Sequence, residues 1–360
     1  MRRIPPFFLL HIVAALFLLL AAIPLKGTHI TGAEITYKCV NPATSSYEVT
    51  ITVYRDCING QAPFDANIRL FVFRGSNGTL FTTRQITLNT TAVELIPVYW
   101  NSCTGVPYNL CVEYAKYKTT INLPPLAGGY NLAWARCCRN NIVTNIFTNQ
   151  GITVLASIPG TNITGCNSMP TFNNLPPVFL CVGQQFSFDH SAFDVDGDSL
   201  VYSIANPFTG ISTTGQGATQ FNPVVSIGGG GNPMGPPPYQ NINFLGGYSF
   251  TDPFASGNFG IDAQSGLLTL TPTQTGISVF AVSVKEYRNG VLLSENKRDF
   301  QISVINCVPQ GQEPDINSAP VAGGTGDTIY TDPKKNICYT ITLTDPNVGD
   351  TVELFPVSAT

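Results

Sequence analysis

The sequence predicts an all-β protein whose strands stack into β-sandwiches. Runs of β-branched and aromatic residues, often in alternation, recur from residue 34 onward. Turn-forming residues separate these runs, and no window shows a sustained helical period of 3.6 residues. Short strands at regular spacing between turns are typical of sandwiches, in which two sheets pack face to face.

A first sandwich is expected at residues 28–160, a length that is ordinary for one domain. The strands expected there are Glu34–Val40, Tyr47–Arg55, Ile68–Arg74, Leu80–Leu88, Leu110–Leu123, Tyr130–Arg136 and Ile152–Ile158. Pairs such as Asn59-Gly60 and Gly128-Gly129 predict the turns between them, because these residue types tolerate tight backbone conformations.

A linker rich in glycine and proline is expected at residues 161–177, followed by a second sandwich at residues 178–307. Within this second sandwich, Val279–Tyr287 and Phe300–Ile305 alternate cleanly around a turn and predict a terminal hairpin. Four glycines at residues 228–231 precede it. No Lys-Ser or Lys-Thr follows them, so they predict a surface loop rather than a phosphate-binding loop.

An acidic turn in the second sandwich has an echo near residue 350. Asp194-Val195-Asp196-Gly197-Asp198 and Asp345-Pro346-Asn347-Val348-Gly349-Asp350 each follow an alternating run, in the same phase. Repeats at domain-sized intervals indicate tandem modules. We therefore expect a linker at residues 308–320 and the start of a third, truncated repeat at residues 321–360, which makes the sequence a fragment of a longer protein.

Residues 1–27 have the pattern of a secretory signal peptide. Arg2 and Arg3 precede an apolar run from Phe7 to Ile23, which Pro24 breaks. The run is shorter than the roughly 20 residues that a spanning helix needs, and no later stretch is long enough to span a bilayer. A retained N-terminal anchor is the alternative to cleavage after Gly27. We expect an exported protein, at the cell surface or extracellular.

Export favours disulfides among the ten cysteines, because thiols pair in oxidising compartments. No Cys-x-x-Cys occurs, which removes the commonest zinc and redox motif. Adjacent Cys137 and Cys138 are poorly placed to bridge each other, so each is expected to pair elsewhere. The pairings considered are Cys137 or Cys138 with Cys39 or Cys57, and Cys103 with Cys111. The disulfide candidates are Cys39, Cys57, Cys103, Cys111, Cys137, Cys138, Cys166, Cys181 and Cys307.

The low charge of the chain argues against nucleic acid as a partner. Charged residues make up 11% of the sequence, against about 25% in an average soluble protein. Removal of residues 1–27 takes away three basic residues and changes the formal net charge from 18 − 22 = −4 to 15 − 22 = −7. Such a chain is a poor electrostatic match for a phosphate backbone.

The acidic turn is the candidate metal site. Asp194, Asp196 and Asp198 offer a hard cation such as Ca²⁺ several oxygen ligands in one turn. An EF-hand loop is excluded, because its glycine and glutamate positions hold Ser199 and Ala205. Two interpretations stay open: a calcium-binding β-turn, and a solvated Asp/Gly turn that needs no metal.

Catalytic constellations are weak in this sequence. After the signal peptide only His29 and His190 remain, there is no Gly-x-Ser-x-Gly, and His190 alternates with phenylalanines as a packed sheet residue does. A glycoside hydrolase needs two carboxyl groups across a cleft. The remaining candidates are scattered and are expected on exposed strand faces: Glu94, Glu113 and Glu286. No enzyme is therefore predicted.

Aromatic residues allow two interpretations. Trp100, Trp134, Tyr99, Tyr114, Tyr117 and Tyr130 form either a stacking platform for a glycan or part of the core. Trp134 lies between small residues just before two cysteines, as a core tryptophan packed against a disulfide does. Core packing is the preferred interpretation.

Several segments of residues 28–160 resemble large multi-domain surface proteins of Bacteroidetes-type bacteria, of the gliding-motility-associated or PKD-domain-containing kind. The matching segments are Thr28-His29-Ile30-Thr31-Gly32-Ala33-Glu34-Ile35-Thr36-Tyr37-Lys38-Cys39, Tyr54-Arg55-Asp56-Cys57 and Trp134-Ala135-Arg136-Cys137-Cys138-Arg139. The resemblance also implies cleavage just before Thr28.

The second sandwich is similar to cadherin-like, dystroglycan-type modules. The matching segments are Ala192–Tyr202, Gly260–Leu267 and Thr271–Gly276. This resemblance implies tandem immunoglobulin-like β-sandwich domains, calcium binding, and a role in cell-surface adhesion or scaffolding, with other surface proteins or surface glycans as partners. The alternative function is a carbohydrate-binding accessory region of a secreted glycan-processing protein.

Overall fold

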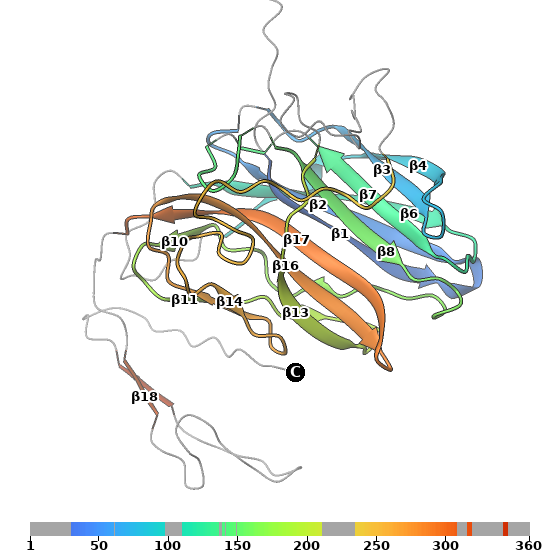
Figure 1. The fold of residues 1–360 in the computed structure, drawn as a ribbon. Coiled ribbons are helices and arrows are strands. Elements are labelled where there is room, and N and C mark those ends of the chain that lie inside the picture. Colours follow the sequence, from blue (N-terminus) through green and yellow to red (C-terminus); the bar gives the residue numbers. More distant parts are fainter. Residues whose placement is uncertain are drawn as a thin grey trace, which may run out of the picture.

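The fold is almost entirely β-sheet, which confirms the predicted class (Figure 1). The computed structural model describes residues 30–60, 62–97, 110–136, 139–140, 142–148, 150–210, 235–307, 315–318 and 341–344. Within these ranges the helical elements are two short 3-10 turns, η1 (Pro42–Thr44) and η2 (Thr90–Ala92). No helix in this part of the chain is long and apolar enough to cross a membrane.

One long sheet runs through both predicted sandwiches. Its strand order is β13-β16-β17-β1-β2-β6-β5, and β10 pairs with β17 in parallel. The bounds of these strands are β1 (Ile30–Asn41), β2 (Ser46–Asp56), β5 (Val93–Leu95), β6 (Val112–Asn122), β10 (Phe179–Cys181), β13 (Ser199–Ala205), β16 (Gly276–Arg288) and β17 (Val291–Ile305). The hairpin predicted around residues 288–290 is β16–β17.

Smaller sheets pack on the long one. A four-stranded sheet has the order β4-β3-β7-β8, and a three-stranded sheet has the order β11-β15-β14. Their strands are β3 (Asn67–Arg74), β4 (Leu80–Thr87), β7 (Tyr130–Arg136), β8 (Ile152–Ile158), β11 (Phe186–Asp189), β14 (Gly260–Ile261) and β15 (Leu267–Leu270). Two further pairs are β9 (Thr171–Phe172) with β12 (Ala192–Phe193), and β18 (Asp315–Ser318) with β19 (Ile341–Thr344).

The four-stranded sheet and the three-stranded sheet cover opposite faces of the long sheet. Where β1 meets β17, Gly32 lies opposite Phe300 and Ala33 lies opposite Asp299. Because successive side chains of a strand alternate between faces, Ala33 and Phe300 point to different sides. Ala33 belongs to the core under the four-stranded sheet, and Phe300 to the core under the three-stranded sheet. Gly32 permits this approach, since a Cβ there would lie 2.4 Å from the carbonyl oxygen of Asp299.

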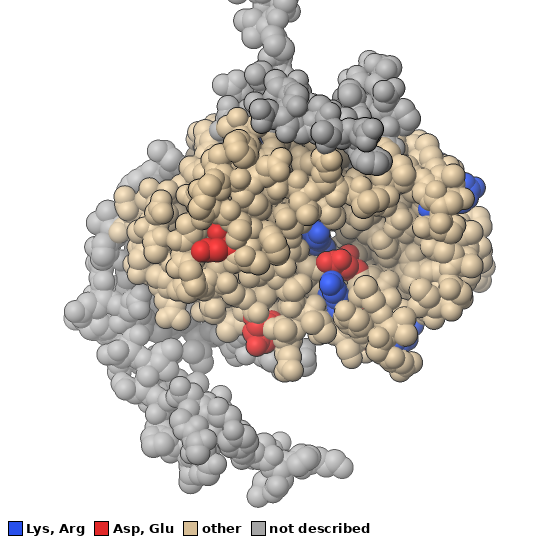
Figure 2. All heavy atoms as spheres, viewed as in Figure 1, with Lys and Arg blue, Asp and Glu red and all other residues tan. Residues whose placement is uncertain are grey.

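Each face has its own core. The first core fills the space between β1, β2 and β6 and the four-stranded sheet, with Ile35, Ile51, Leu70 and Trp134 among its members. The second core is smaller and rich in phenylalanine. It packs Leu268, Leu270, Phe280 and Phe300 against one another, with Phe186 and Phe188 at its edge. On the face drawn in Figure 2, charged side chains are few and scattered.

The predicted linker at residues 161–177 is packed, contrary to expectation. Asn167, Ser168 and Met169 are buried, and β9 pairs with β12. Proline and glycine suggested a spacer, but here they end strands while the residues between them cover the sheet. The predicted linker at residues 308–320 likewise contains the strand β18. The signal peptide and the turn at residues 345–350 lie outside the described residues.

Within the described residues, three disulfides join Cys39 to Cys166, Cys57 to Cys111, and Cys181 to Cys307. The expected pairings of Cys39 and Cys57 with the adjacent cysteines, and of Cys103 with Cys111, are therefore wrong. Two of these bonds close loops of more than 100 residues, with sequence separations of 127 and 126. Sequence spacing gives no sign of such partners. Cys103, Cys137 and Cys138 lie outside the described residues.

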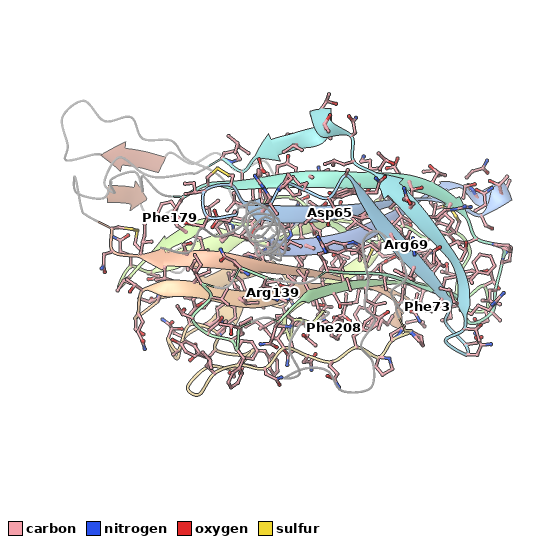
Figure 3. All side chains as sticks on the ribbon, turned by 90° about the horizontal axis from the view of Figure 1, so that it is seen from above. Asp65, Arg69, Phe73, Arg139, Phe179 and Phe208 are labelled. Atoms are coloured by element: carbon pink, nitrogen blue, oxygen red, sulfur yellow. A yellow bond between two sulfur atoms is a disulfide. The ribbon has the colours of Figure 1, made fainter. Side chains whose placement is uncertain are left out.

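Buried ion pairs fasten the junction of β1 and β17. Arg139, labelled in Figure 3, is 2% exposed. It donates to Asp299 Oδ1 at 2.7 Å. Its Nε also donates to the carbonyl oxygen of Gly151 at 2.9 Å. One residue along, Arg298 donates to both carboxylate oxygens of Glu34 at 3.1 Å. Each pair connects a segment of the first region to β17.

Candidate metal centre

The acidic turn joins β12 to β13, and its first carboxylate shapes it. Asp194 Oδ1 accepts hydrogen bonds from the backbone N–H groups of Asp196 at 2.9 Å and Asp198 at 3.1 Å. Gly197 has a φ of +78°, a left-handed conformation that favours glycine. The short loop therefore directs the carboxylates of all three aspartates to one side.

Glu286 on β16 completes a four-carboxylate cluster. One oxygen each from Asp194, Asp196, Asp198 and Glu286 lies within 4.8 Å of the others. We expected Glu286 on an exposed strand face, and that prediction is wrong because the side chain is fully buried. Glu286 shares a face with the core residues of β16, since Phe280, Val282, Val284 and Glu286 alternate in phase. That alternation is the sequence signal for its burial.

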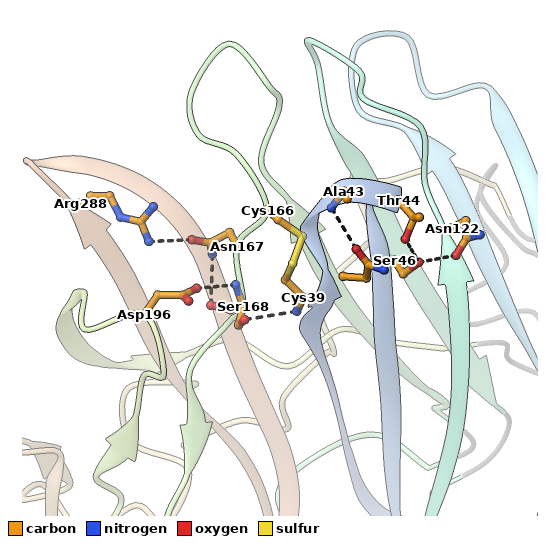
Figure 4. The surroundings of a disulfide bond; sticks show 11 residues. Cys39, Ala43, Thr44, Ser46, Asn122, Cys166, Asn167, Ser168, Asp196 and Arg288 are labelled. Atoms are coloured by element: carbon orange, nitrogen blue, oxygen red, sulfur yellow. Dashed lines mark hydrogen bonds between the residues drawn. A yellow bond between two sulfur atoms is a disulfide. The ribbon is translucent and has the colours of Figure 1, made fainter.

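Arg288 compensates part of the negative charge. Its Nε and Nη2 donate to the two carboxylate oxygens of Asp198 at 2.7 and 2.6 Å. This paired hydrogen bond holds the pKa of Asp198 below its ordinary value. Nη2 also donates to Asn167 Oδ1 at 3.2 Å, which ties the guanidinium to the buried 166–169 segment (Figure 4).

The 166–169 segment reaches the cluster at two further points. The backbone N–H of Ser168 donates to Asp196 Oδ2 at 2.7 Å (Figure 4). Asn167 Nδ2 donates to Glu286 Oε2 at 3.0 Å, and the Ser294 hydroxyl donates to the same oxygen. The disulfide Cys39–Cys166 lies directly before these residues in the chain. The cluster is therefore connected to β1 through a short, cross-linked segment.

Two cluster oxygens are buried without a hydrogen-bond partner among the described residues: Asp194 Oδ2 and Glu286 Oε1. Burial raises the pKa of Asp194. Burial also raises the pKa of Glu286 to about 8, although hydrogen bonds from Ser294 and Asn167 oppose the shift. A buried acceptor without a donor costs free energy, so both oxygens favour a cation or a proton.

The donor set fits a hard divalent cation. Ca²⁺ takes six to eight oxygen ligands at about 2.3–2.6 Å, from carboxylates, carbonyls and water. With Glu286 protonated, the three aspartates and Arg288 leave two uncompensated negative charges. A divalent cation balances these two charges while Glu286 keeps its proton. If the cation displaced that proton and took Glu286 as a ligand, one negative charge would remain. Asp194 and Glu286 would be the buried ligands, and Asp196 the exposed one.

The other candidate residues do not form a catalytic group in the described part of the chain. His190 is fully buried just after β11, and its ring contacts Phe172, Phe188 and Phe300. Burial lowers the pKa of His190 well below its ordinary value, so the ring is neutral. Glu113 pairs with Arg55 and Glu94 accepts from the Tyr114 hydroxyl.

The predicted aromatic platform is not present as an exposed surface. Tyr114, Tyr117, Tyr130 and Trp134 are all buried, which favours the core interpretation. Tyr99, Trp100 and His29 lie outside the described residues. No protein-family model matches the chain, and no curated protein matches it at a significant level.

Proposed function

We propose that this protein is a non-enzymatic, exported surface scaffold of the adhesion type, stabilised by calcium at the acidic cluster. The observation that carries the calcium assignment is the pair of buried, unpartnered oxygens, Asp194 Oδ2 and Glu286 Oε1. Three disulfides support an oxidising compartment. The resemblance to cadherin-like modules of bacterial surface proteins, with tandem immunoglobulin-like domains, supports the adhesion role.

The position of the cluster supports a structural rather than a catalytic role for the cation. Its ligands come from the β12–β13 turn and from β16, and the 166–169 segment binds them from a third side. A cation there would fasten the turn and the segment to the end of the long sheet. Arg288, Asn167 and Ser168 already donate hydrogen bonds to oxygen atoms of Asp198, Glu286 and Asp196, which leaves little room for a substrate.

Calorimetric titration of the disulfide-bonded protein with CaCl₂ tests this proposal. At pH 7 we expect one site, and a heat that changes with the ionisation enthalpy of the buffer, because calcium displaces the proton of Glu286. Asp196→Asn should weaken binding about tenfold by removal of one charged ligand. Asp262→Asn, in an exposed turn elsewhere, is the matched control and should change nothing.

Two results would contradict the calcium proposal or the role of Glu286 in it. If millimolar calcium produces no heat and leaves the melting temperature unchanged, the turn is a solvated Asp/Gly turn. A heat that does not depend on the buffer would remove Glu286 from the ligand set, because no proton would then be released.

A further inference from the structure

A groove of about 510 Å³ lies on the face of β1, β2 and β6 that the first core leaves open. Ala33, Ile35 and Tyr37 face the first core, so the alternate residues of β1 face the groove. The 168–175 segment, which contains β9, forms one side of the groove. Phe193 at the end of β12 and Val195 of the acidic turn form part of its rim. The groove therefore adjoins the proposed calcium site.

Polar side chains of β1, β2 and β6 form the base of the groove, in rows that run across the strands. In one cross-strand row Thr36 lies opposite Thr50, and Thr50 lies opposite Lys118. In the next row Thr52 lies opposite Lys116. The hydroxyl groups of Thr36 and Thr50 make no hydrogen bond to other described side chains or backbone groups, so both are available to a ligand. Neighbouring strands place such groups about 4.8 Å apart.

The charge of the groove is positive although the chain is acidic. Lys38, Lys116 and Lys118 line it, and these are three of the five lysines in the described residues. Lys118 Nζ lies 3.7 Å from Glu48 Oε1, and this carboxylate offsets part of the charge of Lys118. Lys38 and Lys116 are exposed and make no ion pair within the described ranges. Two ammonium groups are therefore left for an anionic ligand.

The rim adds an apolar surface. Phe193 is 62% exposed and Val195 is 52% exposed. Exposed side chains of this size at the edge of a polar groove offer a flat apolar face to a ligand. The C–H-rich face of a pyranose ring matches such a ring face, while its hydroxyl and carboxylate groups match threonine and lysine.

We propose that this groove binds a short segment of an acidic polysaccharide, a chain of uronic acid units. The proposal rests on the adhesion function above and supplies its ligand class. An extended peptide would gain most of its affinity by adding a strand to a sheet edge. The groove instead lies over the face of a sheet whose backbone groups are already paired between β1, β2 and β6. Recognition there depends on side chains, and their basic and hydroxyl groups fit carboxylates and sugar hydroxyls.

The test is calorimetric titration of the disulfide-bonded protein with a galacturonic acid hexamer and with the neutral galactose hexamer. We expect binding of the acidic hexamer only, with an affinity that falls as salt rises. The double variant Lys38→Gln, Lys116→Gln should weaken binding about tenfold, and Phe193→Ala should weaken it about fivefold. Lys285→Gln, on the opposite face of the long sheet, is the matched control and should have no effect. Unchanged melting temperatures establish that the variants fold.

Several results would overturn the groove assignment. These are equal binding of the neutral hexamer, equal binding of polyglutamate of similar length, an equal loss in Lys285→Gln, or no binding of the acidic hexamer. Each titration is repeated in EDTA, and the melting temperature is measured with and without calcium. A protein that calcium stabilises but that does not bind the hexamer disproves the groove proposal alone. A protein that binds the hexamer but does not respond to calcium disproves the calcium proposal alone.

Discussion

The two cores of this protein differ in size and in what surrounds them. The first core joins β1, β2 and β6 to a complete four-stranded sheet and is mostly aliphatic. The second core joins β16 and β17 to a sheet of three short strands, and phenylalanines fill it. A small core buries less apolar area and so contributes less stability. The second core is therefore the one that needs additional ties.

Several such ties lie around the second core, although the first region also has a disulfide of its own, Cys57–Cys111, and the ion pairs Arg55–Glu113 and Arg136–Asp65. The buried pair Arg139–Asp299, the disulfide Cys181–Cys307 and the acidic cluster all fasten the strands of the second core from outside. The shared sheet alone does not hold the second core in place, because polar and covalent links compensate for a thin second layer.

Arg139→Met should lower the free energy of unfolding by about 3–5 kcal/mol, because Asp299 would be left as a buried charge without its partner. Arg84→Met, at an exposed position on β4, is the control and should stay within about 0.5 kcal/mol. Urea unfolding measures both. If the free energy of unfolding falls by the same amount in both variants, the Arg139–Asp299 pair does not hold the second core to the first.

Cys181→Ser with Cys307→Ser should cost about 3 kcal/mol, because the bond restricts a long loop of the unfolded chain. The Cys57–Cys111 bond closes a shorter loop. Its removal by Cys57→Ser with Cys111→Ser should lower the free energy of unfolding by about 0.7 kcal/mol less, because the unfolded chain regains less entropy. Thermal unfolding with and without reductant measures the difference. A melting temperature that is the same with and without reductant would contradict both expectations.

Glu286 should make stability depend on pH when calcium is absent. Its pKa in the folded protein is raised to about 8 from an ordinary value of 4.5. The folded state therefore holds this proton more tightly, and the resulting stability is present below about pH 4.5 and is lost as pH rises through about 8. Glu286→Gln should flatten this slope in EDTA. A slope that survives in the variant would assign the titration to another group.

His190 should produce a slope of opposite sign. Burial lowers its pKa below the ordinary value of 6.5, so the unfolded chain takes up the proton first. Stability from this residue is present above about pH 6.5 and is lost as pH falls toward the folded pKa. His190→Leu in the Glu286→Gln background should reduce the acid sensitivity of urea unfolding. An identical pH profile in both proteins would contradict the neutral buried ring.

Local patterns predicted the strands well and their assembly poorly. The alternation at residues 279–287 predicted β16, and the turn at residues 288–290 predicted its hairpin, because both depend on neighbours in sequence. The pairing of β1 with β17 joins residues about 270 positions apart and leaves no local signal. The long-range disulfides and the approach of Glu286 to the acidic turn are hidden for the same reason. Three of the four clustered carboxylates, Asp194, Asp196 and Asp198, lie within five residues of the sequence, and the fold brings Glu286 to them.

The long-range disulfides also decide which residues would bear a mechanical load. Cys39 is bonded to Cys166 and Cys181 to Cys307. A pulling force applied at β1 and beyond Cys307 would pass through the Cys39–Cys166 bond and the Cys181–Cys307 bond. Between these two bonds it would pass along the backbone from Cys166 to Cys181 only. Most of both cores lies within the bypassed loops, so stretching would not unravel those loops while the bonds stay oxidised. Reduction would release two lengths of extensible chain.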